Sequence, residues 1–204
     1  LTSKAGRALL VELIAKTGIL VTNLPATGFL AHDKLAALRP DLITVRIMGW
    51  PDGSVALDYT ANAVVGYPSL TGVGDEPVNH VLPAWDLLTG AYAAFALLAV
   101  LRRRDQTGEG AEIRLPLTDI AMGSAANLGR VAEVLYTGKD RERLGNAVFG
   151  TIGRDFVTAD GVRIMIVAIN ERQWNGLVKA LGLAEDIAAI EAESQARRDY
   201  IAMA

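Results

Sequence analysis

Asp86 is the residue whose surroundings are best suited to chemistry. It lies in HVLPAWDLLTG (80–90), where most neighbours are apolar or small and Pro83 comes shortly before it. In the first turn of a helix, a carboxylate is stabilised by free N–H groups and by the positive end of the helix dipole. The same place would keep the acid ordered and partly desolvated, so that it could attack an activated acyl group, with Gly90 leaving room for a ligand. The local sequence leaves both interpretations open, a helix-start acid or a nucleophile.

Asp58, in LDYTANAVVG (57–66), is a second acid at an expected helix start. Aspartate is a preferred N-cap residue, and Asn62 follows on the same helical face. Its simplest interpretation is therefore a cap of its own helix. The loop TNLPATG (22–28) follows an expected strand, and ligands of parallel sheets bind outside the carboxyl ends of strands. That loop could contact a ligand or serve only as a turn.

Residue counts exclude several other kinds of catalytic site. The chain has no cysteine, which rules out disulfides, thiolate zinc sites and a cysteine nucleophile. Its two histidines are His32 and His80, too few for a multi-histidine metal site, and no G-x-S-x-G motif is present. We expect no metal site and interpret His80 as a loop residue.

The composition describes a packed globular chain. Of 204 residues, 51% are hydrophobic and 21% charged, and the net charge is -3. No basic stripe indicates a nucleic-acid partner. The apolar run LLTGAYAAFALLAVL (87–101) is shorter than the roughly 20 residues of a membrane span, so we interpret it as a core helix and expect no membrane partner. The lack of cysteine fits a cytoplasmic location.

The elements that must position these acids alternate along the chain. Helix, strand, helix and strand within the first 50 residues predict an α/β fold with a parallel sheet. A hairpin turn at Asp160-Gly161 marks a change of pattern, and we place a domain boundary near residue 140. We expect strands at 19–23, 41–49 and 111–117 and helices at 3–17, 31–38, 59–65, 83–104, 118–137, 171–182 and 184–204.

Taken together, the segments resemble the family III CoA-transferases. The resemblance runs through KAGRALL, ILVTNLPATG, LRPDLITVRIMGW, LDYTANAVVGYPSLTG, the long stretch from LPAWDLLTG to LPLTDIA, RLGN and FVTADGVRIMIVAINERQW. In that family the acid at the position of Asp86 is the catalytic aspartate. The resemblance implies that Asp86 attacks an acyl-CoA thioester, forms a mixed anhydride and then carries CoA as an aspartyl thioester. It implies no permanently bound cofactor, with coenzyme A entering as an acyl-CoA substrate.

The resemblance also implies the residues that bind CoA. Asn23 and Leu24 stand where the family has an Asn-Phe pair, and Leu57, Asp58 and Tyr59 match the stretch that lines the thiol end of CoA. Racemases of the same family carry a catalytic histidine where this chain has Leu57, which counts against racemisation. Two alternatives to CoA transfer remain, a 2-methylacyl-CoA racemase and a non-catalytic CoA-binding subunit.

The loop after TNLPATG is several residues shorter than in typical members of the family, which commonly carry there an arginine on the adenine side of CoA. This chain lacks that arginine, and His32 or Lys34 could replace it. DYTANAVVGYP, PVNHVLPAWDLL and FGTIGRDF look most like members that move CoA between the two carboxyls of mesaconyl-CoA.

Size and assembly follow from the same resemblance. Family members are much longer, so we expect a fragment of a longer chain. Residues 1–117 would be part of a large Rossmann-like CoA-binding domain, 118–142 a connecting helix and linker, and 143–204 the start of a smaller α+β domain. The expected partners are acyl-CoA, carboxylic acid substrates and a second copy of the chain in an interlocked homodimer.

Overall fold

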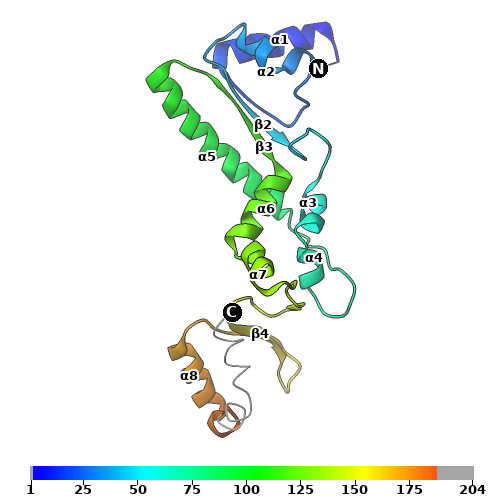
Figure 1. The fold of residues 1–204 in the computed structure, drawn as a ribbon, viewed down its shortest axis with the longest axis vertical. Coiled ribbons are helices and arrows are strands. Elements are labelled where there is room, and N and C mark those ends of the chain that lie inside the picture. Colours follow the sequence, from blue (N-terminus) through cyan, green and yellow to red (C-terminus); the bar gives the residue numbers. More distant parts are fainter. Residues whose placement is uncertain (1, 188–204) are drawn as a thin grey trace. The chain divides into compact units, whose positions relative to one another are not determined.

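The computed structural model describes residues 2–187 (Figure 1). Residues 2–68 and 79–141 form one compact unit, and residues 69–78 and 142–187 form a second. The expected helix 184–204 lies largely outside the described residues. The domain limits predicted at residues 117 and 143 stay a prediction. In the structure, residues 118–141 belong to the first unit.

The first unit is built on a parallel sheet of three strands. Its strands are β1 (Ile19–Thr22), β2 (Ile43–Met48) and β3 (Ala111–Pro116), in the order β1-β2-β3. Both neighbouring pairs are parallel, with Ile43 in register with Ile19 on one side and Ala111 on the other. The three expected strands and the parallel α/β arrangement are confirmed, with ends that differ by one or two residues.

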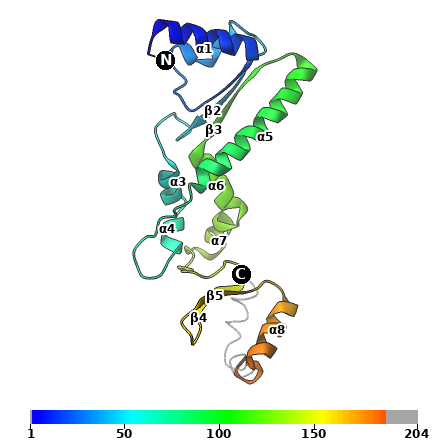
Figure 2. The ribbon, with the colours of Figure 1, turned by 180° about the vertical axis from the view of Figure 1, so that it is seen from behind.

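Two helices cover one part of this sheet. They are α1 (Lys4–Thr17) and α2 (His32–Ala36), which lie together in Figures 1 and 2, and the short 3-10 helix η1 (Gly28–Leu30) precedes α2. The side chain of Ser3 accepts a hydrogen bond from Gly6, and Gly18 ends α1 in the left-handed conformation. Their shared core is formed by Ile14, Leu30, Leu35 and Leu42.

Helix α5 (Ala84–Thr107) begins with the segment that contains Asp86. Figures 1 and 2 show it running beside β2 and β3, and Ala93 packs with Ile43 and Val45 in one hydrophobic cluster. At 24 residues it is longer than expected, and by length and composition it could cross a membrane. The argument from length against a membrane span was therefore wrong, because the helix begins at Ala84, before the apolar run 87–101, and the added residues give a stretch long enough to span. Its packing against the sheet is what a core helix requires.

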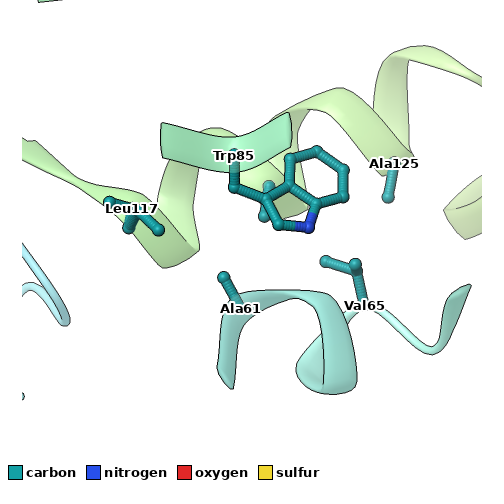
Figure 3. Packing of buried hydrophobic residues seen from close by; sticks show 6 residues of the cluster. Ala61, Val65, Trp85, Leu117 and Ala125 are labelled. Carbon is teal, nitrogen blue, oxygen red and sulfur yellow. The ribbon is translucent and has the colours of Figure 1, made fainter. Parts of the chain in front are cut away.

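The expected single helix at 118–137 is in fact two helices. They are α6 (Leu117–Asn127) and α7 (Arg130–Thr137), separated by Gly129 at φ 81°, a conformation that favours glycine. The remaining helices of this region are α3 (Asp58–Val64) and α4 (Tyr67–Leu70). Figure 3 shows Trp85 of α5 packed among Ala61, Val65 and Ala125, so one hydrophobic cluster joins α3, α5 and α6.

The second unit contains a hairpin followed by a helix. Strands β4 (Ile152–Val157) and β5 (Arg163–Ala168) pair antiparallel, and Gly161 takes a positive φ in the turn between them. Helix α8 (Glu171–Leu181) begins at Asn170, whose side chain accepts the N–H of Gln173. The expected hairpin and the helix at 171–182 are confirmed.

Candidate active site

Asp86 lies in the first turn of α5 with its side chain exposed. The residue at the helix N-cap, Pro83, provides no side-chain cap. One turn beyond Asp86, Gly90 is also exposed, and a Cβ added there would meet nothing within 4 Å. The carboxylate and the helix surface beside it therefore face open space on this unit, as a nucleophile for a bulky substrate requires.

The missing cap of α5 comes from another helix. Asp58, the first residue of α3, is only 3% exposed. Its Oδ2 accepts the backbone N–H of Trp85 at 2.6 Å and that of Asp86 at 3.2 Å. The interpretation of Asp58 as a cap of its own helix was wrong, because Leu57 holds that position. Asp58 instead satisfies N–H groups that the first turn of α5 would leave unpaired.

His80 binds the other oxygen of the same carboxylate. Its Nε2 lies 2.6 Å from Asp58 Oδ1, and its ring meets Tyr59 edge-on with centroids 5.8 Å apart. His80 does lie in the loop before α5, but its interpretation as a plain loop residue missed this contact. The two partners are 22 residues apart, so no local pattern could have indicated it.

Two asparagines extend this arrangement into a network. The Trp85 indole Nε1 donates to Asn62 Oδ1 at 3.2 Å, and Asn62 Nδ2 donates to Asn79 Oδ1 at 3.1 Å. Asn79 Oδ1 also accepts the backbone N–H of His80. The polar contacts therefore link α3, the loop before α5 and the first turn of α5. Such a satisfied network holds its members rigid and would fix the backbone that carries Asp86.

The electrostatic surroundings of Asp86 make its carboxylate more basic. Partial burial raises the pKa of Asp86 above its ordinary value, and the negative charge of nearby Asp58 raises it further. An ionised carboxylate with a raised pKa is a stronger nucleophile than an ordinary one. Exposed apolar side chains stand beside both acids in the sequence, among them Leu57, Leu82 and Leu87. They offer the apolar surface with which a substrate could exclude water.

Asn23 and Leu24 follow β1 at the carboxyl edge of the sheet, where the sequence placed them. The backbone N–H of Leu24 donates to the Thr22 hydroxyl at 3.0 Å, and its carbonyl accepts from buried Arg46. None of the hydrogen bonds found within residues 2–187 joins Asn23 or Leu24 to either acid. The structure thus brings the segment 57–59 to the start of α5, where Asp86 lies, and the hydrogen bonds of the described residues do not link Asn23 or Leu24 to it.

His32, which we considered as a substitute for a CoA-binding arginine, has a structural contact. Its Nδ1 lies 2.9 Å from the hydroxyl of Thr44, a residue buried in β2. Lys34 is exposed on α2. Of these two candidates, Lys34 is therefore the better placed to meet a phosphate in solution.

The sequence of this chain is similar to curated CoA-handling enzymes. It is 44% identical over 193 residues to the 2-methylfumaryl-CoA isomerase of Chloroflexus aurantiacus, and the match covers 92% of this chain and 47% of that protein. It is 30% identical to the succinate–glutarate CoA-transferase of Agrobacterium fabrum, over 90% of this chain and 48% of that enzyme. The chain therefore spans about half the length of the curated relatives it matches.

The fold is also similar to a solved structure. A CAIB/BAIF family protein from Brucella suis superposes with a TM-score of 0.74 at 28% identity, covering 90% of this chain and 50% of that one. The family model described as CoA-transferase family III matches residues 1–202, almost the whole sequence. The chain belongs to CoA-transferase family III.

Proposed function

We propose that this protein transfers coenzyme A from one carboxyl group to another through covalent intermediates on Asp86. One observation carries the proposal: an exposed carboxylate at the start of α5 has its backbone N–H fixed by a second, buried carboxylate. The names of the relatives support it, because the enzymes from Chloroflexus and Agrobacterium are an acyl-CoA isomerase and a CoA-transferase.

The proposed reaction begins when an Asp86 oxygen attacks the thioester carbonyl. The carbon–sulfur bond breaks, CoA leaves as a thiolate, and Asp86 and the acyl group share a mixed anhydride. The thiolate then attacks the Asp86 carbonyl, which expels the acyl group as a carboxylate and leaves an aspartyl-CoA thioester. A substrate carboxylate next attacks that thioester, re-forming an anhydride and the thiolate. Attack of the thiolate on the substrate carbonyl completes the new acyl-CoA and restores ionised Asp86, with no net transfer of a proton.

The residues around Asp86 would support these steps in two ways. Asp58 fixes the N–H groups of Trp85 and Asp86, so the nucleophile starts from a defined backbone position. Apolar side chains such as Leu57 and Leu87 would keep water from the anhydride once a substrate covers them.

We propose the narrower substrate class from the 44% identical relative. The acyl group would be a methyl-branched dicarboxylate such as mesaconate, with CoA moving between carbons 1 and 4 of one molecule. Asn23, Leu24, Leu57, Asp58 and Tyr59 stay the proposed CoA-binding residues. Because both Asp58 oxygens already have partners, its contribution would be made through the positions of Leu57 and Tyr59. No permanently bound cofactor is needed for this chemistry.

One observation favours a second candidate, racemisation of a 2-methylacyl-CoA. Leu57 replaces the histidine of the racemases, but His80 reaches Asp58 from a different segment. Racemisation requires two proton-transfer groups, and His80 with Asp86 would supply them. Deuterium entering the α-carbon from D₂O, without movement of CoA between carboxyls, would identify this activity.

Assembly and location are proposals of the same kind. We propose a homodimer, because Phe95 and Leu98 of α5 are exposed on this chain. We also propose that the enzyme is cytoplasmic and has no nucleic-acid or membrane partners.

The test is a transfer assay on the protein expressed from its complete reading frame. We expect mesaconyl-C1-CoA to be converted into the C4 isomer, followed by chromatography, and Asp86→Asn to lower kcat by at least about a thousandfold. Asp119→Asn is the matched control, because Asp119 is also an exposed acid in a first helical turn after a proline N-cap. Full activity of Asp86→Asn would rule out the proposed function.

A further inference from the structure

Arg46 is buried at the centre of the parallel sheet. It lies in β2, between β1 and β3, and only 1% of its surface is exposed. A guanidinium stays charged in a protein, so burying it is costly unless hydrogen-bond acceptors surround it. The position of Arg46 therefore calls for an explanation from its partners.

All three guanidinium nitrogens of Arg46 have acceptors. Nη1 donates to the Leu24 carbonyl at 2.6 Å and Nη2 to the Leu30 carbonyl at 2.9 Å. Nε donates to Glu112 Oε1 on β3 at 3.3 Å. Two of the three acceptors are thus backbone carbonyls near the two ends of one segment, the loop that leads from β1 to α2.

The faces of β2 show that this contact is part of a pattern. Ile43 and Val45 point to the side that packs with α5. Thr44 and Arg46 alternate with them, and both are buried against residues 24–32, Thr44 through His32 and Arg46 through Leu24 and Leu30. One face of the strand is therefore a buried polar surface on which the loop rests.

We propose that Arg46 is a positioning residue for CoA binding, because it holds the loop of residues 23–31 in the conformation that receives CoA. The inference rests on the proposed function, in which Asn23 and Leu24 contact CoA. A loop that is already ordered loses less conformational entropy when a ligand binds, so its affinity is higher. Arg46 would thus act on CoA through the loop, without contact with the reacting atoms.

Arg114 provides a matched control on the neighbouring strand. It is in register with Arg46 and donates to the second oxygen of the same Glu112, with Nε 3.0 Å from Oε2. Its side chain is 56% exposed, and its described hydrogen bonds and ion pairs go to Glu112. Replacing Arg114 removes the same charge from the same row of the sheet and leaves the loop contacts in place.

The experiment compares Arg46→Lys, Arg46→Met and Arg114→Met in the protein expressed from its complete reading frame. Calorimetry with CoA gives Kd, and steady-state assays give KM and kcat. We expect both Arg46 variants to raise Kd and KM about tenfold or more, as for a lost charged hydrogen-bond donor. Their kcat should stay within about threefold of the parent, and Arg114→Met should match the parent in all three constants. A folded Arg46→Lys protein with the parent's Kd and KM would overturn the inference.

Limited proteolysis of the unmutated protein tests the same inference without any variant. We expect the peptide bonds of residues 23–31 to resist a protease of broad specificity before CoA is added, because an ordered loop does not fit a protease active site. Rapid cleavage within this loop that stops only when CoA binds would contradict a preorganised loop. Tight CoA binding by a parent protein that transfers no CoA would instead count against the proposed function, and the effect of Arg46 on Kd would still be measured.

Discussion

Asp58 and Asp86 are neighbouring carboxylates with different surroundings. Asp58 is 3% exposed and accepts hydrogen bonds from two backbone N–H groups, with His80 at its other oxygen. Asp86 is exposed, and the charge of Asp58 is one of the causes that raise its pKa. Environments that separate two acids in this way assign them different roles. Here the buried acid supports the backbone, and the accessible acid is free to react.

The support given by Asp58 predicts a loss of stability in Asp58→Ala. The substitution leaves the N–H groups of Trp85 and Asp86 without their acceptor, so the free energy of unfolding should fall by about 2 kcal/mol. Urea unfolding measures the change. Asp119→Ala, in the first turn of α6, should cost no more than about 0.5 kcal/mol. Equal losses in the two variants would show that Asp58 has no special part in holding α5.

The raised pKa of Asp86 predicts a pH dependence of transfer. Asp86 must be ionised to attack, so kcat/KM should fall on the acid side at a pH above the ordinary range of aspartate. Asp58→Asn removes the negative charge and so lowers the pKa of Asp86, which moves this acid limb to lower pH. The pH profiles of parent and variant with one substrate measure the shift. An unchanged or upward-shifted limb in the variant would contradict the assigned cause.

At the scale of elements, local signals predicted most helices and strands. Gly18 ends α1 in the left-handed conformation as expected, and α5 begins at Ala84, one residue after the expected start at Pro83, which is its N-cap. Such signals depend on the residue and its immediate neighbours. The break at Gly129 was missed because a glycine within a helical pattern is often tolerated. The signal that could have found it was the pairing of Asn127 with Gly129, since asparagine and glycine are both typical of helix C-termini.

The missed parts of the site depend on distant partners. Asp58 and Trp85 are 27 residues apart, and Arg46 and Leu24 are 22 apart. Only the fold brings these pairs together, so no spacing in the sequence indicates them. Asp86 itself was found, because its setting at a helix start is local and the surrounding segment resembles the family.

Gly90 gives a prediction for helix α5. Alanine there should raise the free energy of unfolding by about 0.8 kcal/mol, because glycine is a poor helix former and the new Cβ meets no atom. If the space beside Asp86 receives the substrate, kcat/KM should fall about tenfold at the same time. Gly123→Ala in α6 is the matched control, since its Cβ also meets nothing, and it should stabilise without loss of activity. A Gly90→Ala variant with the same kcat/KM as the parent protein would show that the substrate does not occupy this space.

At the scale of the whole molecule, the candidate site belongs to one of the two units. Asp58, His80 and Asp86 all lie in the first unit, together with the parallel sheet. The domain limits predicted from the sequence at 117 and 143 stay a prediction, and the structure divides the chain into units after residue 141. No pattern in the sequence indicated that residues 69–78 belong with the second unit, because their partners lie far along the chain. Leu144 and Gly145, for example, donate backbone hydrogen bonds to the Leu70 carbonyl from more than 70 residues away.

The proposed assembly predicts the mass of the protein in solution. Phe95 and Leu98 of α5 are 73% and 66% exposed on this chain, and their spacing of three residues places them on the same face of the helix. Exposed apolar side chains that lie together can mark a protein–protein interface. We expect light scattering to give twice the mass of one polypeptide. A mass of one polypeptide across the micromolar range would contradict the homodimer.

The central claim, that Asp86 carries the acyl group and then CoA, is tested most directly by trapping. The protein is incubated with mesaconyl-CoA, quenched with hydroxylamine or borohydride, digested and analysed by mass spectrometry. Hydroxylamine should convert Asp86 into its hydroxamate, and borohydride should reduce its carboxyl carbon to an alcohol, both within the peptide that contains AWDLLTG. A modification on another residue, or turnover with no modified residue at all, would contradict the account.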